Sequence, residues 1–309
     1  MNTLIKNQST FDLAGYCAPQ THSLQTYLQT RARINRLCDR YLSCEILTEH
    51  LQDLPTQFES PHQRPWQPIH WNAIAKDQII GVDPALFLSV LASSVEVETP
   101  IREYSTESWH FFKAVHPQMA YFMGGIRDED GKIIEISEWE KEERQHAPVF
   151  SKIYEKLTGI KLCPKPNSVQ DNQSTENPVY EVYKHVLSRI GTEWSAVSIY
   201  MWLMLHSTGE LQEAIAQPMK DEINHLAKFW GFANWAFQDG FITRVRHIAA
   251  QMLALFDHHR HERSQSNEIL GNNSPLAAIE LAFTFTRILT RLHAWHRQSN
   301  IARLDTLFA

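Results

Sequence analysis

The sequence predicts an all-α protein whose helices converge on a metal-binding cluster. Only 11 of the 309 residues are glycine, and apolar residues recur at helical spacing almost throughout. No segment stands out as a strand by strict alternation of polar and apolar residues. Two segments, Glu142-Glu143-Arg-Gln-His146 and Asp221-Glu222-Ile-Asn-His225, each place a carboxylate and an imidazole on one helical face. These observations predict both the fold class and the position of the candidate site.

The N-terminal quarter of the chain predicts helices followed by a Pro-rich connector. Residues 23–54 have the period of one or two amphipathic helices. Prolines and two tryptophans then mark residues 55–71 as a connector. Asp83-Pro84 has the residue types of an N-cap and first helical position. Because Pro100 and Pro117 lie within or beside the helix that follows, we expect that helix to be kinked.

Three long helices and a final shorter one are expected in the rest of the chain. A polar stretch at 163–176 suits a long crossover between the first two, and Ser274-Pro275 starts the last helix. We expect a single domain built from an N-terminal extension (1–82), a four-helix bundle (83–240) and C-terminal helices packed on the bundle (241–309). The long helices are predicted at about 136–157, 177–205 and 210–238, and the last one ends near Trp295.

Two turn-rich breaks predict how the helices fold back on themselves. One break lies at 122–132, between Glu107 and Glu143, and the other at 206–209, between Glu193 and Glu222. If each break joins antiparallel helices, Glu107 lies level with the Glu143 pair and Glu193 with the Glu222 pair. Four carboxylates and two imidazoles then converge from four helices, which predicts a dinuclear metal site.

Chance alone explains a single Glu-x-x-His pair but not this arrangement. The numbers of Glu and His in the chain predict about one such pair, and the chain has four. The pair Glu59–His62 contains Pro61 and is expected to be a loop coincidence. The double hairpin, the extra acid before each of the two pairs, and the matching Thr106-Glu107 and Thr192-Glu193 are not expected by chance.

The charge of the cluster supports a dimetal site. Four buried carboxylates would be costly unless they were protonated or paired with cations, and two divalent ions balance four negative charges. Oxygen and imidazole donors suit iron or manganese. Zinc would more often recruit thiolates, and no cysteine falls near the ligand positions.

These motifs resemble those of the ferritin-like diiron-carboxylate superfamily over residues 84–238, with Glu from two helices and Glu-x-x-His from two others. The acid-Glu-x-x-His form is most similar to acyl-carrier-protein desaturases, hydroxylase components and ribonucleotide reductase small subunits. The resemblance implies a ferritin-like four-helix bundle with a long crossover. It also implies two iron ions, with Mn/Fe as an alternative, bridged by Glu143 and Glu222. Glu107 and Glu193 would bind terminally, and His146 and His225 would bind one to each metal.

The residues around the ligands leave several roles open. The resemblance implies that Glu142 and Asp221 orient a ligand histidine through its ring N–H, whereas Glu142 could also lie on a solvated acidic face. Glu103, one turn before Glu107, could supplement or replace it, although the hairpin geometry favours Glu107. Glu98 is expected on the opposite face. His110 is a third-histidine candidate or a hydrogen-bond partner near the metals.

Two departures from the family limit what can be carried over. Phe150 stands where radical-forming reductase subunits have a tyrosine. Ala196 and Val197 stand where many hydroxylases and desaturases have a threonine. The apolar face of the same helix is either core or the wall of a substrate tunnel, with core as the default; it comprises Ile190, Val197, Tyr200, Met201 and Met204.

Composition narrows the cellular setting. The net charge of −6 argues against nucleic-acid or anionic-membrane binding. The four cysteines (Cys17, Cys38, Cys44 and Cys163) form no C-x-x-C pair, which fits a reducing cytoplasm. No signal-peptide pattern or apolar run of membrane-spanning length is present. The histidine-rich run at 257–263 is interpreted as a cationic helix end rather than a second metal site.

The leading functional hypothesis is a non-haem dimetal oxidase or oxygenase that uses O₂ to hydroxylate, desaturate or cleave an organic substrate. The substrate would be free or carrier-bound, with a modest preference for an apolar or acyl group. Because no Fe–S or flavin fingerprint is present, an external donor such as a ferredoxin or a reductase is expected. A homodimer is one candidate assembly. The alternatives are a ferroxidase-type protein of iron handling and a non-catalytic helical interaction protein.

Overall fold

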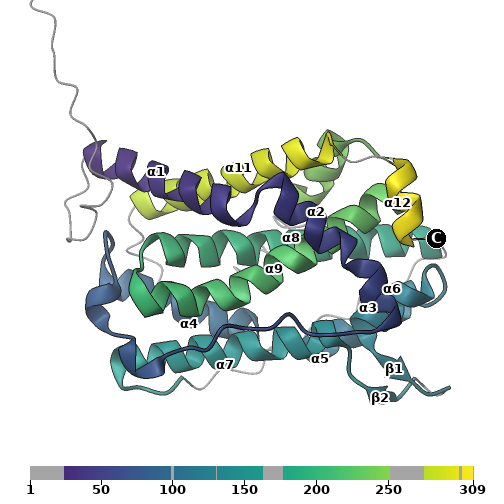
Figure 1. The fold of residues 1–309 in the computed structure, drawn as a ribbon, viewed down its shortest axis with the longest axis horizontal. Coiled ribbons are helices and arrows are strands. Elements are labelled where there is room, and N and C mark those ends of the chain that lie inside the picture. The colour runs from purple at the N-terminus through teal and green to yellow at the C-terminus, as the bar shows by residue number, and fades with distance from the viewer. Residues whose placement is uncertain are drawn as a thin grey trace, which may run out of the picture.

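The computed structural model describes residues 24–98, 101–129, 131–162, 177–237, 239–250, 275–298 and 301–308 (Figure 1). Most of these residues are helical, so the predicted all-α class is confirmed for them. The expectation of no strand was wrong at one place. Strands β1 (Ile126–Arg127) and β2 (Ile133–Glu135) pair antiparallel as a short two-stranded sheet.

Four long helices form the centre of the molecule. They are α4 (Pro84–Val97), α7 (Glu138–Thr158), α8 (Pro178–Leu205) and α9 (Gly209–Ala236). Helix α9 packs against α7 and α8, and α4 packs against α7 and α8. Asp83 caps α4 as expected, because its Oδ1 accepts a hydrogen bond from the backbone N–H of Ala85 at 2.8 Å. The predicted break at 206–209 is a short connection that turns the chain from α8 into α9.

The segment between α4 and α7 is more elaborate than a hairpin. The expected kinked helix is two helices, since α4 ends at Val97 and α5 (Ile101–Phe112) begins after Pro100. Helix α6 (Pro117–Gly124) and the β1–β2 hairpin follow before α7 starts. Gly125 at this junction has φ 70°, and a Cβ there would lie 2.1 Å from the carbonyl oxygen of Glu135. Only glycine fits this close approach of the chain.

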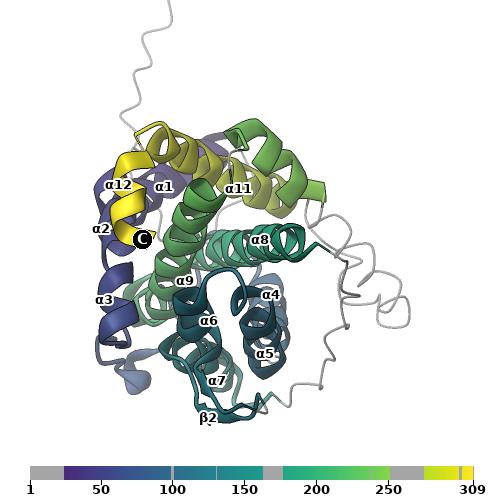
Figure 2. The same ribbon diagram turned by 90° about the vertical axis from the view of Figure 1, so that its right-hand side faces the viewer.

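The remaining elements surround the four-helix centre. The N-terminal part forms α1 (Leu24–Tyr41), α2 (Cys44–Gln52) and α3 (Leu54–Glu59), and then an extended connector that leads to the short turns η2 (Trp71–Ala73) and η3 (Lys76–Gln78). At the C-terminus, α11 (Pro275–His296) packs on α8 and α1, and α12 (Ile301–Phe308), which was not predicted, packs on α9. Figure 2 shows α1, α11 and α12 on the side of the bundle away from α7.

A continuous apolar core joins these layers. Buried side chains from α1, α2, α4, α7, α8, α9 and α11 belong to one cluster. Residues 241–250 are also helical. Within the described ranges, no helix is long and apolar enough to cross a membrane, as the sequence predicted. The polar loop at 163–176, the run at 257–263, Cys17 and Cys163 lie outside the described residues.

Candidate metal centre

Six side chains meet in the interior of the four-helix centre. They form two overlapping groups, in each of which one ligand atom per residue lies within 4.8 Å of all the others. The first group is Glu98, Glu143, His146 and Glu222, and the second is Glu143, Glu193, Glu222 and His225. Glu143 and Glu222 belong to both groups, so their carboxylates can span two cations. All six side chains are at least 94% buried, with Glu98 the most exposed at 6%.

Helical spacing brings most of these groups together. Glu143 and His146 lie one turn apart on α7, and Glu222 and His225 lie one turn apart on α9, so each pair shares a face. The short connection between α8 and α9 sets their antiparallel register. It places Glu193 beside the α9 pair, with its Oε2 3.6 Å from Nδ1 of His225. The structure therefore brings together five of the six expected ligands.

Each histidine is oriented by an acid on the other helix of the two, namely the acid that comes directly before the Glu-x-x-His pair of that helix. Nε2 of His225 on α9 lies 2.8 Å from Oε2 of Glu142 on α7, and Nε2 of His146 on α7 lies 3.2 Å from Oδ2 of Asp221 on α9. A carboxylate at this position favours the tautomer with hydrogen on Nε2, which leaves the Nδ1 lone pair free to bind a cation. Glu142 is buried, so its alternative placement on a solvated face was wrong.

Four polar atoms in the cluster have no hydrogen-bond partner although they are buried. They are Oε1 of Glu143, Oε1 of Glu222, and Nδ1 of His146 and of His225. Buried polar atoms in proteins are almost always satisfied, so an unsatisfied set at one point calls for a missing partner. Nδ1 of His225 lies 2.8 Å from Oε1 of Glu143, and Nδ1 of His146 lies 3.0 Å from Oε1 of Glu222, yet neither pair forms a well-directed hydrogen bond. Two cations of the iron or manganese type fit these donors.

The electrostatics of the cluster also favour cations. Burial raises the pKa of Glu222, and the nearby Glu143 and Glu193 carboxylates raise it further. Burial by itself would lower the pKa of His146 and of His225, but the acids around each ring outweigh burial and raise both pKa values well above the usual range. Without metal, the imidazoles therefore hold protons that offset part of the negative charge. Divalent cations would replace those protons.

Glu98 occupies the position that the sequence assigned to Glu107, and its expected placement on an opposite face was wrong. Glu98 follows the last residue of α4, and its Oε2 lies 3.8 Å from Nδ1 of His146. The hydroxyl of Ser105 donates to Glu140 at 2.6 Å, so this level of α5 faces the first turn of α7. Glu107 lies further along α5, away from the level of Glu143, and is not a member of either group.

The other two candidate residues on the helix that carries Glu107 are His110 and Glu103. His110 is exposed and lies edge-on against the ring of Trp109, 5.3 Å between centroids, so the expectation that it faces the metals was wrong. The reason is the one given for Glu107: α5 continues past the cluster, and His110 lies further along it. The side chain of Glu103 lies outside the described residues.

Tyr200 contacts the cluster in a way that the sequence did not predict. Its hydroxyl donates a hydrogen bond to Oε1 of Glu98, and its ring packs on Phe150 with centroids 4.6 Å apart. Tyr200 had been assigned only to an apolar helix face. That face is buried in the core, as the default interpretation held. The one sequence signal for the hydroxyl was its position seven residues after Glu193, two turns along α8.

The extended connector after α3 also contributes to the site, which the sequence did not reveal. Glu142 and Asp221, the acids that contact the histidines from outside the cluster, are called the outer acids. Arg64 donates to both: its backbone N–H donates to Oε1 of Glu142 at 2.5 Å, and its Nε donates to Oδ1 of Asp221 at 2.6 Å. The indole N–H of Trp66 donates to Oδ2 of Asp221 at 2.7 Å. The connector therefore lies across α7 and α9 on the outer side of the histidines.

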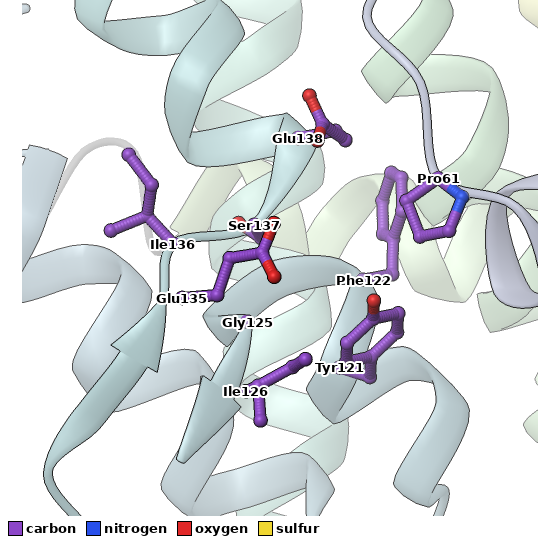
Figure 3. A pocket seen from close by; sticks show the side chains of 9 residues that line it. All are labelled: Pro61, Tyr121, Phe122, Gly125, Ile126, Glu135, Ile136, Ser137 and Glu138. Atoms are coloured by element: carbon purple, nitrogen blue, oxygen red, sulfur yellow. The ribbon is translucent and has the colours of Figure 1, made fainter.

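A surface pocket lies apart from this cluster, where the connector meets the hairpin and the start of α7 (Figure 3). Its walls include none of the candidate ligands. The lining residues are Pro61, Tyr121, Phe122, Gly125, Ile126, Glu135, Ile136, Ser137 and Glu138.

Comparisons with known proteins do not assign this chain to a family. No protein-family model matches the chain, and neither curated proteins nor solved structures give a significant match.

Proposed function

We propose that this chain is a ferritin-like dimetal protein that binds two iron ions and uses O₂ to oxidise an organic substrate. The observation that carries the proposal is the pair of overlapping ligand groups that share Glu143 and Glu222. A manganese and iron pair suits the same donors. The arrangement of Glu from two elements and Glu-x-x-His from two others supports the ferritin-like assignment.

Six residues would bind the cations, and two further acids would orient the ligand histidines. Glu143 and Glu222 would bridge, while Glu98 with His146 and Glu193 with His225 would complete the two positions. Glu142 and Asp221 hold the ring N–H groups, which keeps each Nδ1 directed inward. Four ligand carboxylates would balance the charge of two divalent cations.

The two ions, when bound, supply the one-electron redox chemistry that reduction of O₂ requires. The chain contributes a dry environment, because the cluster is buried among apolar side chains of α7, α8 and α9. Exclusion of water protects a reactive site from side reactions. The electrons that O₂ reduction needs beyond those of the substrate would come from an external donor, which we propose to be a ferredoxin or a reductase.

The proposal is tested by loading the purified protein with Fe(II) under anaerobic conditions and measuring bound iron. We expect two ions per chain in the wild type and in Glu107→Ala, and a loss in Glu98→Ala. The loaded protein is then exposed to O₂ with and without a panel of organic compounds. Product formation dependent on one class of compound supports an oxygenase or oxidase. Turnover of many free irons per chain without any organic compound would overturn it in favour of iron handling, and absence of bound metal would overturn the centre itself.

A further inference from the structure

Among the described connector residues, Arg64 is the one whose hydrogen bonds reach both Glu142 and Asp221. Its backbone N–H donates to Glu142 and its guanidinium donates to Asp221. A second guanidinium nitrogen, Nη2, donates to the backbone carbonyl of Gln217 at 2.6 Å, so the side chain is held on α9 at two points. A guanidinium with two such acceptors has one favoured orientation.

Each outer acid uses its two oxygens for different partners. Glu142 accepts from His225 on Oε2 and from the Arg64 backbone on Oε1. Asp221 accepts from His146 on Oδ2 and from the Arg64 side chain on Oδ1. A carboxylate bonded at one oxygen can still rotate about its χ angles, whereas bonds at both oxygens fix its plane. The plane of the carboxylate in turn fixes the ring that donates to it.

We propose that Arg64 is a positioning residue that fixes both ligand histidines at once, through Glu142 and Asp221; this inference rests on the proposed metal centre. The connector is thus part of the centre, although it supplies no ligand. Trp66 supports the same arrangement, because its indole N–H shares Oδ2 of Asp221 with His146 and its ring lies nearly parallel to that of His146, with 14° between the planes.

Arg64 contacts Glu142 and Asp221 through different chemical groups. The Glu142 contact uses a backbone N–H, which any residue except proline retains, while the Asp221 contact uses the side chain. Replacing the side chain alone should therefore affect the His146 position. Removing the backbone N–H as well should affect both positions. This difference separates positioning from a general loss of stability.

The experiment measures Co²⁺ binding by calorimetry and by the visible absorption of the bound ion. Five proteins are compared: wild type, Arg64→Met, Arg64→Pro, Arg64→Lys and the control Arg33→Met. Arg33 is a matched control, because its guanidinium also joins distant elements, donating to the backbone carbonyls of Leu205 and Ser207 at 3.1 Å each, outside the cluster. Arg64→Lys tests whether positive charge alone is sufficient.

We expect Arg64→Met to bind one of two Co²⁺ equivalents about tenfold more weakly, the low end of the range for groups that support a ligand histidine. Arg64→Pro should weaken both equivalents, and both variants should change the visible spectrum. Arg33→Met should retain both affinities and the spectrum, even if its melting temperature changes. Arg64→Lys should resemble Arg64→Met, because lysine lacks the paired donors of the guanidinium. If Arg64→Pro does not fold, the titration of Arg64→Met decides.

The outcomes separate the two proposals. Wild-type protein that binds fewer than two Co²⁺ ions would overturn the dimetal centre and this inference with it. Two ions bound with unchanged affinity and spectrum in Arg64→Met would overturn the positioning role alone. Full recovery in Arg64→Lys would also overturn it, because charge rather than the fixed geometry would then be the cause.

Discussion

The hydroxyl of Tyr200 donates a hydrogen bond to Glu98, so a residue within α8 holds the acid that follows the last turn of α4. Glu98 follows the last residue of α4, so helical structure restrains it less than the other candidate ligands, which lie within helices. Burial raises the pKa of Tyr200 well above its usual value, and the Glu98 charge raises it further, so the phenol remains a donor. The pair makes the Glu98 side of the centre different from the Glu193 side.

Tyr200→Phe should therefore weaken binding of one metal ion and leave the other nearly unchanged. Loss of a hydrogen bond to a buried charged acceptor costs about 1–3 kcal/mol, which corresponds to roughly 5- to 150-fold in affinity. Calorimetric titration with Co²⁺ measures this. Tyr183→Phe is the control, because its hydroxyl bonds Asp239 at 2.8 Å, outside the cluster. Equal affinities in wild type and Tyr200→Phe would show that Glu98 is held without the phenol.

Glu98→Ala and Glu107→Ala should give opposite results. Glu98→Ala should lose metal at the position that contains His146, whereas Glu107→Ala should keep two ions per chain, because Glu107 belongs to neither ligand group. Metal analysis after gel filtration measures the stoichiometry. Loss of an ion in Glu107→Ala with retention in Glu98→Ala would return the assignment to the residue that sequence spacing favoured.

Glu143→Ala or Glu222→Ala should abolish binding of both ions, because each carboxylate belongs to both ligand groups. His146→Ala should lose one ion preferentially, since His146 belongs to one group only. Metal content and the Co²⁺ spectrum distinguish these outcomes. A Glu143→Ala variant that retained two ions would contradict its bridging role.

Local spacing predicted the parts of the site that one helix, or two helices joined by a short turn, determine. His146 follows Glu143 by three residues, and the short connection between α8 and α9 leaves little freedom in the register of Glu193. Between α5 and α7 the chain instead forms α6 and a β-hairpin. Counting residues from an assumed turn centre could not include these elements, so the prediction placed Glu107 where the fold places Glu98.

Contacts across the fold were beyond the reach of sequence periodicity. The connector that the prolines predicted begins later than expected, because residues 55–59 belong to α3. Nothing in its composition showed that Arg64 would meet two acids on different helices. The hydroxyl of Tyr200 was hidden for a similar reason, because its ring fits an apolar face and only the packing of α4 against α8 gives it a partner. These contacts depend on how helices pack, which local propensity does not determine.

Removal of metal should lower the thermal stability of the protein near neutral pH. A ligand that binds only the folded state stabilises it, and chelation also leaves four buried acids close together. Calorimetry with and without a chelator should show a lower melting temperature for the metal-free protein. The Glu143→Ala variant should show little response to the chelator and serves as the control. An unchanged melting temperature after complete removal of metal from the wild type would contradict a buried cluster.

His50 should make the protein less stable in mild acid. Burial, with the positive charges of Lys228 and Arg64, lowers the pKa of His50 from 6.5 to about 4, and the Asp53 carboxylate opposes this shift only in part. Between these two pH values the unfolded chain binds a proton on His50 that the folded chain excludes, so the free energy of unfolding falls as the pH drops from about 6.5 to about 4. Above pH 6.5 this contribution is absent. Urea unfolding of His50→Gln should therefore show a smaller loss of stability across this window than the wild type, while His70→Gln, at an exposed position, should follow the wild type. Parallel curves for wild type and His50→Gln would mean that His50 takes up its proton in the folded protein as readily as in the unfolded chain.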